Sequence, residues 1–225
     1  MSLRLDWATH ESAKYACQNW HYSRCVPSGK LVKIGVWEDD KFIGVVIYCH
    51  GSCFNLSKPY GLSMIECCEL GRIALDKHQN PVSKILSISL KFLKRFCPGI
   101  RLVVSFADPE QNHHGCIYQA TNWIYTGKSS SSTCLKKGAE TLHERTFGER
   151  YGSRSKETIK KNGYEIVRIE GKHRYIFPFD KEIYERVNSL SKSYPKRATS
   201  IDSDATGFQS EKGGVNPTVA VHGRK

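Results

Sequence analysis

The sequence lacks the patterns that mark several large classes of protein. None of its apolar runs reaches the length needed to span a bilayer, and its first residues include no apolar core of a signal peptide. The nine cysteines are odd in number and include no CxxC pair, and several of them stand inside apolar segments. These absences disfavour membrane insertion and a disulfide framework, so we expect a protein of a reducing cytoplasm.

Motifs for a metal or a methyl donor are also missing. No HxH, HExxH or CxxC spacing is present, so a zinc site has little support. A conventional adenine methyltransferase is disfavoured, because the chain has no glycine-rich loop for S-adenosylmethionine. The segments Asn80-Pro81-Val82 and Asp108-Pro109-Glu110 both lack the second proline and the aromatic residue that such an enzyme uses.

Acidic residues are few relative to basic ones. The chain has 34 Lys+Arg against 22 Asp+Glu, which gives a formal net charge of +12. Residues 128–197 alone hold 17 of the 34 basic residues against 9 acidic ones. A surplus of this size favours a polyanionic partner, most simply nucleic acid, and a merely solvated basic face is the alternative.

The apolar and turn patterns predict an α/β fold. We expect Thr9 to cap a first helix and Asp39-Asp40 to join the two strands of a hairpin. Asn80-Pro81 and Asp108-Pro109 are each expected to start a helix, with the polar residue as its cap. The expected elements are a helix after Thr9, strands over 31–37, 41–49 and 64–75, a helix over 81–96, a strand over 102–106, a helix from 109 and a strand over 123–125.

The basic C-terminal part is expected to continue the same domain. Its pattern predicts a helix over 153–162, a hairpin of strands 164–169 and 173–178 that turns at Glu170-Gly171, and a helix over 180–191. From Ser193 onward the chain is polar and aperiodic, which is typical of disorder. We therefore expect one domain over residues 1–191, whose part 128–191 contacts the nucleic acid, and a disordered tail over 192–225.

The stretch 101–128 carries most of the candidate chemistry. A short apolar strand feeds a helix there, and ligands of open α/β sheets bind beside the carboxyl ends of strands. Gly115 inside this helix indicates the close approach of a neighbouring backbone or ligand, and His114 should share a helix face with Tyr118. The polar residues at the exit of the strand are Ser105, Asp108, His113, His114 and Tyr118.

The element order is similar to that of the GNAT (Gcn5-related N-acetyltransferase) fold. This resemblance implies a mixed, mostly antiparallel sheet flanked by helices, in which two strands splay apart around an acyl-CoA. The diphosphate of that ligand would meet the start of the helix at Asn80. The Gly-rich Q/R-x-x-G-x-G/A loop is replaced by residues 76–81, which puts ordinary acetyl-CoA use in doubt. The implied cofactor-binding residues are Ile73, Leu75, Asn80 and Ser83.

Longer motifs resemble a narrower family. HYS at 21–23, ELGRIAL at 69–75, N-x-x-S at 80–83, VSFADPxxxHxGxIYQAxNWxYxG from residue 104 and KHRY at 172–175 resemble the Mom family of phage DNA-modification proteins. The resemblance covers roughly residues 15 to 180, and one departure is Asn112 at a glycine position. It implies a GNAT-like catalytic domain that converts adenine in DNA to N6-carbamoylmethyladenine. That product shields phage DNA from restriction, so the enzyme acts in the cytoplasm of a bacterial host.

The chemistry that this activity requires can be matched to residues. The exocyclic amine of adenine is a weak nucleophile that must lose a proton, and its base must be flipped out of the duplex. His21 is a candidate base or metal ligand, Tyr22 a candidate stacking residue or proton donor, and Asp108 either a catalytic residue or only a helix cap. We expect Trp20, Tyr22, Tyr118 and Trp123 to line the base pocket, with core packing favoured for Trp123. The full catalytic set is His21, Tyr22, Ser105, Asp108, His113 and Tyr118, with His114 as the second choice to His113.

The donor and the partners follow from the resemblance and the charge. The donor is acyl-CoA-like or glycine-derived, and iron held by His21, Asp108 and His113 is an option that residue spacing does not decide. The partner is double-stranded DNA with no membrane, and a homodimer stays open. The expected phosphate contacts are Arg154, Lys156, Lys160, Lys161, Lys172 and Arg174.

Two other functions remain as alternatives. A GNAT acyltransferase for a protein or small-molecule amine would bind acyl-CoA and show no salt-sensitive binding to DNA. A DNA-binding protein without catalysis would keep all its function after Asp108→Ala and Tyr118→Phe.

Overall fold

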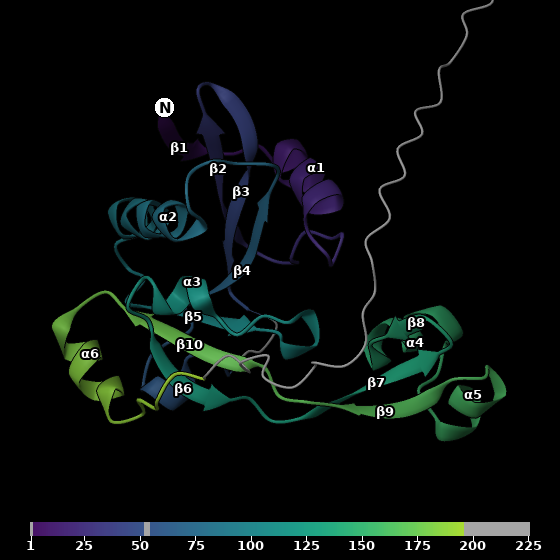
Figure 1. Ribbon diagram of the computed structural model, residues 1–225. Helices are drawn as coiled ribbons and strands as arrows, with labels where there is room; N and C mark the ends of the chain where they lie inside the picture. The colour runs from purple at the N-terminus through teal and green to yellow at the C-terminus, as the bar shows by residue number, and fades with distance from the viewer. Residues whose placement is uncertain (1, 52–54, 196–225) are drawn as a thin grey trace, which may run out of the picture. The chain divides into compact units, whose positions relative to one another are not determined.

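The structure of the protein, a computed structural model, describes residues 2–51 and 55–195 (Figure 1). The chain up to Pro195 forms one compact unit. Most of the tail predicted over 192–225, from residue 196 onward, lies outside the described residues. No helix of the described part is long and apolar enough to cross a membrane, and the eight cysteines described there are free thiols.

A seven-stranded sheet forms the centre of this unit (Figure 1). Its strand order is β1-β2-β3-β4-β5-β10-β6, and each neighbouring pair is antiparallel except β4 and β5, which run parallel. The predicted fold class, a mixed and mostly antiparallel sheet flanked by helices, is confirmed. The strands are β1 (Leu3–Trp7), β2 (Leu31–Glu38), β3 (Lys41–Cys49), β4 (Cys67–Leu75), β5 (Leu102–Ala107), β6 (Ile124–Lys128) and β10 (His173–Pro178).

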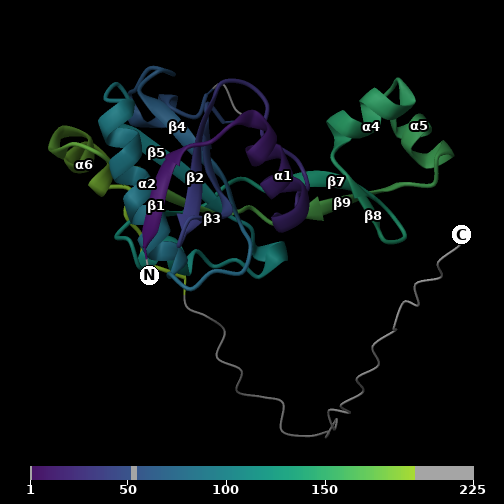
Figure 2. The same cartoon turned by 90° about the horizontal axis from the view of Figure 1, so that it is seen from above.

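Helices cover both faces of this sheet, because successive side chains of a strand point to opposite sides. On β3, Val45 packs in the cluster of α1, whereas Val46 packs in the cluster of α2. Figure 2 shows these two helices on opposite sides of the strands. Thr9 caps α1 as predicted, since its side chain accepts a hydrogen bond from the amide of Ser12. The helices of this part are α1 (His10–Trp20), α2 (Val82–Phe96), α3 (Cys116–Gln119) and α6 (Lys181–Asn188), with a 3-10 turn at Lys58–Tyr60.

A second, three-stranded sheet is inserted between β6 and β10, and we call residues 132–169 the inserted module. It has a small core of its own, formed by Leu135, Phe147, Ile159 and Tyr164. The chain leaves the large sheet after β6 and returns to it at β10 (Figure 1). The elements of the module are β7 (Ser132–Lys137), β8 (Glu140–Leu142), α4 (Glu144–Tyr151), α5 (Lys156–Lys161) and β9 (Glu165–Ile169).

The hairpin predicted over 164–178 is wrong. Both strands exist, but β9 pairs with β7 of the module, and β10 pairs with β5 and β6 of the large sheet. Glu170-Gly171 is therefore the crossing between two sheets. The helix predicted over 153–162 is shorter than expected, and the predicted strand over 64–75 begins only at Cys67. The sequence did not predict β1, β7, β8 and α4.

The helix predicted after Asp108 is broken in two. Asp108 does act as a cap, but only a 3-10 turn at Pro109–Gln111 follows it. The next helix, α3, begins at Cys116, so the expected shared helix face of His114 and Tyr118 is wrong. The reason is Gly115, whose φ is 79° and where a Cβ would lie 2.3 Å from the ring of Tyr175. The close approach predicted at Gly115 is therefore made by a side chain, not by a backbone or ligand.

Candidate active-site cleft

The divergence of β4 and β5 creates the space for a site. The two strands pair over only three positions, from Cys67–Leu102 to Glu69–Val104, although β4 continues to Leu75. At the point of divergence, the hydroxyl of Ser105 donates to the carbonyl of Leu70 at 3.1 Å. A side chain thus replaces the backbone hydrogen bond that the separated strands no longer make. Ser105 is buried and does not face solvent.

A cleft of about 260 Å³ lies beside this divergence. The end of α1 forms one wall, β4 forms the floor, and the segment after β5 forms the opposite wall. Seven aromatic or imidazole rings reach it, from both walls and from the turn after β4. We call it the cleft, and its lining is Trp20, His21, Tyr22, Leu70, Gly71, Arg72, Ile73, Leu75, His78, Val82, Phe106, His113, Ile117 and Tyr118.

Of the residues predicted as catalytic, the structure brings His21, Tyr22, His113 and Tyr118 to this cleft and places Ser105 directly behind it. The pocket-lining candidates Trp20, Tyr22 and Tyr118 also reach the cleft. Trp123 does not, because it is fully buried in the core, where it packs against Tyr118 at 5.0 Å between ring centroids. Core packing, the favoured reading for Trp123, agrees with this position.

Tyr118 and Ser105 form a fixed hydroxyl pair. Their oxygens lie 2.8 Å apart, and burial raises the pKa of Tyr118 to about 12, so the phenol keeps its proton at neutral pH. Ser105 has one proton and the carbonyl of Leu70 only accepts, so Tyr118 must donate when both bonds are present. The lone pairs of the Tyr118 oxygen then remain for a ligand in the cleft. Tyr118 is thus prepared to accept a hydrogen bond there.

His21 is held as a neutral donor. The amide of Ser23 donates to its Nδ1 at 3.1 Å, and the Ser23 hydroxyl lies 2.8 Å from the same atom. Burial, with the nearby charges of Arg72 and His113, lowers the pKa of His21 to about 4. The neutral ring must therefore carry its proton on Nε2, because Nδ1 is used as an acceptor. This tautomer suits a donor of a hydrogen bond and not the general base that the sequence suggested as one option.

Tyr22 stands at the mouth of the cleft. Its side chain is 52% exposed, and its ring stacks on His21 with centroids 4.3 Å apart. The ring of His113 approaches it edge-on from the opposite wall, at 6.0 Å. Three rings thus flank the opening, and a half-exposed aromatic ring in this position is suited to stack on a planar ligand.

The carboxylate of Asp108 is engaged in internal contacts. Its carboxylate accepts from the amide of Glu110 and forms an ion pair of 2.7 Å with Lys172. Asp108 does not belong to the cleft lining. The described residues contain no group of three or more His, Cys, Asp and Glu side chains placed to hold a metal ion. His21, Asp108 and His113 therefore do not fit the iron site that was an option from the sequence.

The turn between β4 and α2 binds an internal carboxylate. Glu38, from the end of β2, accepts hydrogen bonds from the amides of Gln79 and Asn80 at 2.9 and 2.7 Å, and from the Asn80 side chain at 2.8 Å. These bonds lower the pKa of Glu38, so it stays charged. The prediction that Asn80 caps α2 is wrong, because Pro81 occupies the cap position without a side-chain bond.

Only two of the four residues implied as cofactor-binding lie at the cleft. Ile73 and Leu75 line the cleft, whereas Asn80 and Ser83 are absent from its lining. The Asn80 side chain is committed to Glu38 and Lys84. A diphosphate on the amides of this turn would meet the charge of Glu38, so the turn itself does not fit that group. Only the first amides of α2, at Val82 and Ser83, have no cap from a described side chain.

Sequence reasoning missed Arg72 and His78, which both line the cleft. The guanidinium of Arg72 donates to the carbonyls of Gly71 and Cys25 and brings a positive charge to the floor. Nδ1 of His78 lies 2.8 Å from the carbonyl of Asp76. A cationic residue inside the apolar strand ELGRIAL was a usable signal for Arg72, whereas a lone loop histidine gave none for His78.

The predicted DNA contacts fall into two groups. Arg154, Lys156, Lys160 and Lys161 are exposed on the inserted module, and none of them has an ion pair with a described residue. Lys172 and Arg174 lie at the large sheet, where Lys172 pairs with Asp108, and Arg174 donates to the Thr126 hydroxyl at 2.8 Å. The six predicted DNA contacts therefore do not form one continuous group: four lie on the inserted module and two at the large sheet.

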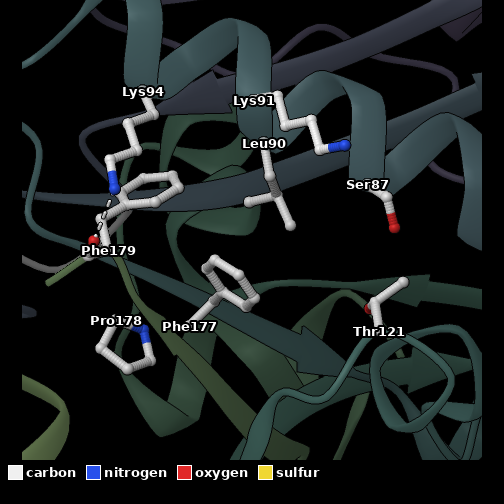
Figure 3. A pocket seen from close by; sticks show the side chains of 8 residues that line it. All are labelled: Ser87, Leu90, Lys91, Lys94, Thr121, Phe177, Pro178 and Phe179. Carbon is white, nitrogen blue, oxygen red and sulfur yellow. Dashed lines mark hydrogen bonds between the residues drawn. The ribbon is translucent and has the colours of Figure 1, made fainter. Parts of the chain in front are cut away.

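A second cavity, of about 340 Å³, lies between α2 and β10 (Figure 3). Its apolar floor includes Phe177 and Leu90, and Lys94 donates to the carbonyl of Phe179 at 2.9 Å. No residue predicted from the sequence lines it. Of these two cavities, only the smaller cleft is lined by residues predicted as catalytic.

The comparison with protein families finds one match over nearly the whole chain. The sequence model of the Mom protein family matches residues 2–196. Among curated proteins, the methylcarbamoylase mom of Escherichia phage Mu is 28% identical over 203 residues, which cover 86% of this chain and 84% of the phage protein.

Solved structures resemble the chain more distantly. An aminoglycoside acetyltransferase, AAC(6')-Ib, in complex with coenzyme A and kanamycin matches with a TM-score of 0.48 and 9% identity, over 83% of this chain and 99% of that one. The AHL synthase LasI matches with a TM-score of 0.40 and 10% identity, over 87% of this chain and 99% of that one.

Proposed function

Because the chain belongs to the Mom protein family, we propose that it is a DNA-modification enzyme that transfers a carbamoylmethyl group to N6 of adenine in DNA. The phage Mu relative is named as a methylcarbamoylase. The observation that carries the proposal is the cleft at the divergence of β4 and β5. It brings together aromatic rings, the uncharged side chains of His21 and Tyr118, and the cation of Arg72. Modification of this kind protects phage DNA from restriction, so the enzyme acts in the cytoplasm of the host cell.

The size and lining of the cleft suit a single flipped base. Its volume of about 260 Å³ is at the lower end of small-molecule sites, which are roughly 300–1,000 Å³. A purine needs aromatic faces to replace the stacking that it loses on leaving the duplex. Tyr22 at the mouth and the rings of His113 and Trp20 supply such faces. We therefore place the adenine between α1 and the segment after β5.

Hydrogen bonds in the cleft would orient the base. The Tyr118 oxygen can accept an N–H of the exocyclic amine, because its own proton is directed to Ser105. The Nε2–H of His21 can donate to a ring nitrogen of adenine or to the carbonyl of the incoming group. Arg72 can hold the negative charge that develops on the leaving group as it departs from the methylene carbon. The amine and the electrophilic carbon would thus be aligned before the bond forms.

The donor is acyl-CoA-like or glycine-derived. Ile73 and Leu75 offer it an apolar wall, and the amides of Val82 and Ser83 offer an anion the start of α2. Glu38 already holds the amides of the preceding turn, so an anionic donor would bind one turn further along than the GNAT resemblance implies.

The inserted module is the part we assign to the DNA backbone. Arg154, Lys156, Lys160 and Lys161 are exposed there without ion-pair partners among the described residues, so each can approach a phosphate. Such contacts give affinity that falls with salt and carry no sequence information. Lys172 orders Asp108 in the structure and would contact DNA only by leaving that ion pair.

Mass spectrometry of nucleosides tests the proposed function directly. DNA from bacterial cells that express the protein should contain deoxyadenosine with the mass increase of one carbamoylmethyl group in place of hydrogen. An acetyl increment on protein or small-molecule amines, with unmodified DNA, would support the acyltransferase alternative. Unmodified DNA and unmodified amines despite soluble expression would favour a DNA-binding protein without catalysis.

A further inference from the structure

We infer that His78, on the turn between β4 and α2, is the base that removes the proton from the adenine amine. This inference rests on the proposed function, since it assigns a residue to that reaction. His78 lines the cleft and lies between ELGRIAL at 69–75 and N-x-x-S at 80–83, outside both motifs.

The first argument is the tautomer of the ring. Nδ1 of His78 lies 2.8 Å from the carbonyl oxygen of Asp76, and a carbonyl oxygen can only accept. Nδ1 must therefore carry the proton, and Nε2 of the neutral ring carries the lone pair. No side chain or backbone group of the described residues hydrogen-bonds to that Nε2. His21 has the opposite tautomer, since Ser23 occupies its Nδ1, so the cleft has a donor and an acceptor imidazole.

The second argument is the rigidity of the turn. Glu38 binds the amides of Gln79 and Asn80, and Asn80 also bonds to Lys84 at the start of α2. These bonds fix the residues that follow His78, while the bond to Asp76 fixes the ring itself.

The third argument is the state of the other candidates. Tyr118 keeps its proton at neutral pH, and the Nε2 of His21 carries a hydrogen. Asp108 is paired with Lys172 and lies outside the cleft lining. His113 reaches the cleft, but no hydrogen bond from a described residue orders its ring. The ring of His78, in contrast, is held by its bond to the Asp76 carbonyl and keeps Nε2 available as an acceptor.

The step can be written with atoms and electrons in balance. The donor is a carbamoylmethyl compound with a leaving group on its methylene carbon. The lone pair of the adenine amine forms the N6–C bond while the bond from that carbon to the leaving group breaks, and the leaving group departs with the electron pair. The Nε2 of His78 takes one N6 proton and later releases it to water. No oxidant or reductant is needed.

The test compares three single variants with the wild type. His78→Asn keeps an N–H near the Nδ1 position for the Asp76 carbonyl but has no base. His113→Gln removes the other acceptor candidate, and His10→Asn makes the same change at an exposed histidine of α1. The readouts are the modified fraction of deoxyadenosine in expressing cells, the melting temperature, and DNA affinity measured with an unmodified duplex.

We expect His78→Asn to lower the modified fraction by about 100-fold or more, with melting temperature and DNA affinity unchanged. His10→Asn should behave as wild type. In a reaction of pure protein, plasmid DNA and cleared cell lysate as the donor source, added imidazole should restore part of the rate to His78→Ala but not to Tyr118→Phe. Rescue of this kind identifies a missing base and is not expected from a loss of structure.

Two results would overturn the role of His78. One is a modified fraction in His78→Asn equal to that of wild type, and the other is loss of modification in His113→Gln with rescue by imidazole at that position alone. A wild-type protein that leaves DNA unmodified would instead contradict the proposed function, so the two failures can be told apart.

Discussion

The cleft and the inserted module solve different problems with different kinds of structure. In the cleft, internal hydrogen bonds fix three polar side chains: Ser105 holds Tyr118, Ser23 holds His21, and the Asp76 carbonyl holds His78. In the module, the cations of α5 project from a small core and have no ion-pair partners among the described residues. Catalysis requires side chains in a fixed geometry, whereas binding to a polyanion requires accessible positive charge. We therefore expect changes in the cleft to affect turnover and changes in the module to affect affinity.

The largest expected effect comes from the core of the module. Phe147 is fully buried among Leu135, Ile159 and Tyr164, so Phe147→Ala should destabilise the module by about 3–5 kcal/mol. Because the large sheet has separate hydrophobic clusters, chemical denaturation should show a new early transition. Ile166→Ala on β9, where the side chain is 47% exposed, is the matched control and should cost under about 0.5 kcal/mol. A single transition shifted as a whole would show that the module has no stability of its own.

Removing the charges of α5 should weaken DNA binding without changing the chemistry. In a Lys156, Lys160 and Lys161→Ala variant, the slope of log affinity against log salt should fall by about 2–3, or roughly 0.9 for each phosphate contact. Modification at saturating DNA should match wild type. The control removes three exposed lysines outside the module, Lys41, Lys58 and Lys181. Equal slopes for both triple variants would contradict the assignment of α5 to the DNA backbone.

These two regions also differ in how well the sequence predicted them. Local signals carry their own structure, so the Thr9 cap and the hairpin at Asp39-Asp40 are confirmed, the latter with both turn residues at positive φ. The pairing of β9 with β7 is a tertiary choice, and two apolar strands around Glu170-Gly171 look locally like a hairpin. Partner strands are selected by burial over long sequence distances, which periodicity does not report.

The same distinction applies to the cleft. The motif around Ser105 and Tyr118 predicted polar residues that the structure places at one wall of the cleft, because a strand exit followed by polar residues is a local pattern. Arg72 and His78 become functional candidates only when β4 diverges from β5 and when Glu38 reaches the turn from β2. For Asp108 the sequence left a catalytic role and a cap open, and in the structure its carboxylate serves as a cap and an ion-pair partner.

A moderate effect is expected from the hydroxyl pair of the cleft. Tyr118→Phe removes the proton that Ser105 accepts and the oxygen that we assign to the adenine amine. The loss of one hydrogen bond should cost about 1–2 kcal/mol in the transition state, which corresponds to roughly a tenfold fall in rate. DNA affinity should be unchanged. Full activity of this variant would remove Tyr118 from the reaction.

The smallest expected effect concerns pH. The pKa of His21 is lowered to about 4 in the folded protein. Between pH 6.5 and 4, His21 is therefore protonated in the unfolded chain but not in the folded protein. Its contribution to stability is thus intact above pH 6.5 and is lost as the pH falls towards 4. His21→Gln should remove this loss and be less acid-sensitive than wild type, by about 1–2 kcal/mol at most after solvent screening. His10→Gln, at an exposed position, is the control for denaturation followed at pH 7 and pH 4.5.

The division between cleft and module is tested most directly by one titration. The modified fraction of deoxyadenosine should be measured while expression is raised stepwise for wild type, the triple lysine variant of α5, and Tyr118→Phe. The account predicts that the lysine variant reaches the wild-type fraction at high expression, because mass action replaces lost affinity, whereas Tyr118→Phe stays behind wild type at each matched level of expression. If the modified fraction stays low for the lysine variant at all expression levels but reaches the wild-type fraction for Tyr118→Phe, the assignment of catalysis to the cleft and of DNA binding to the module is wrong.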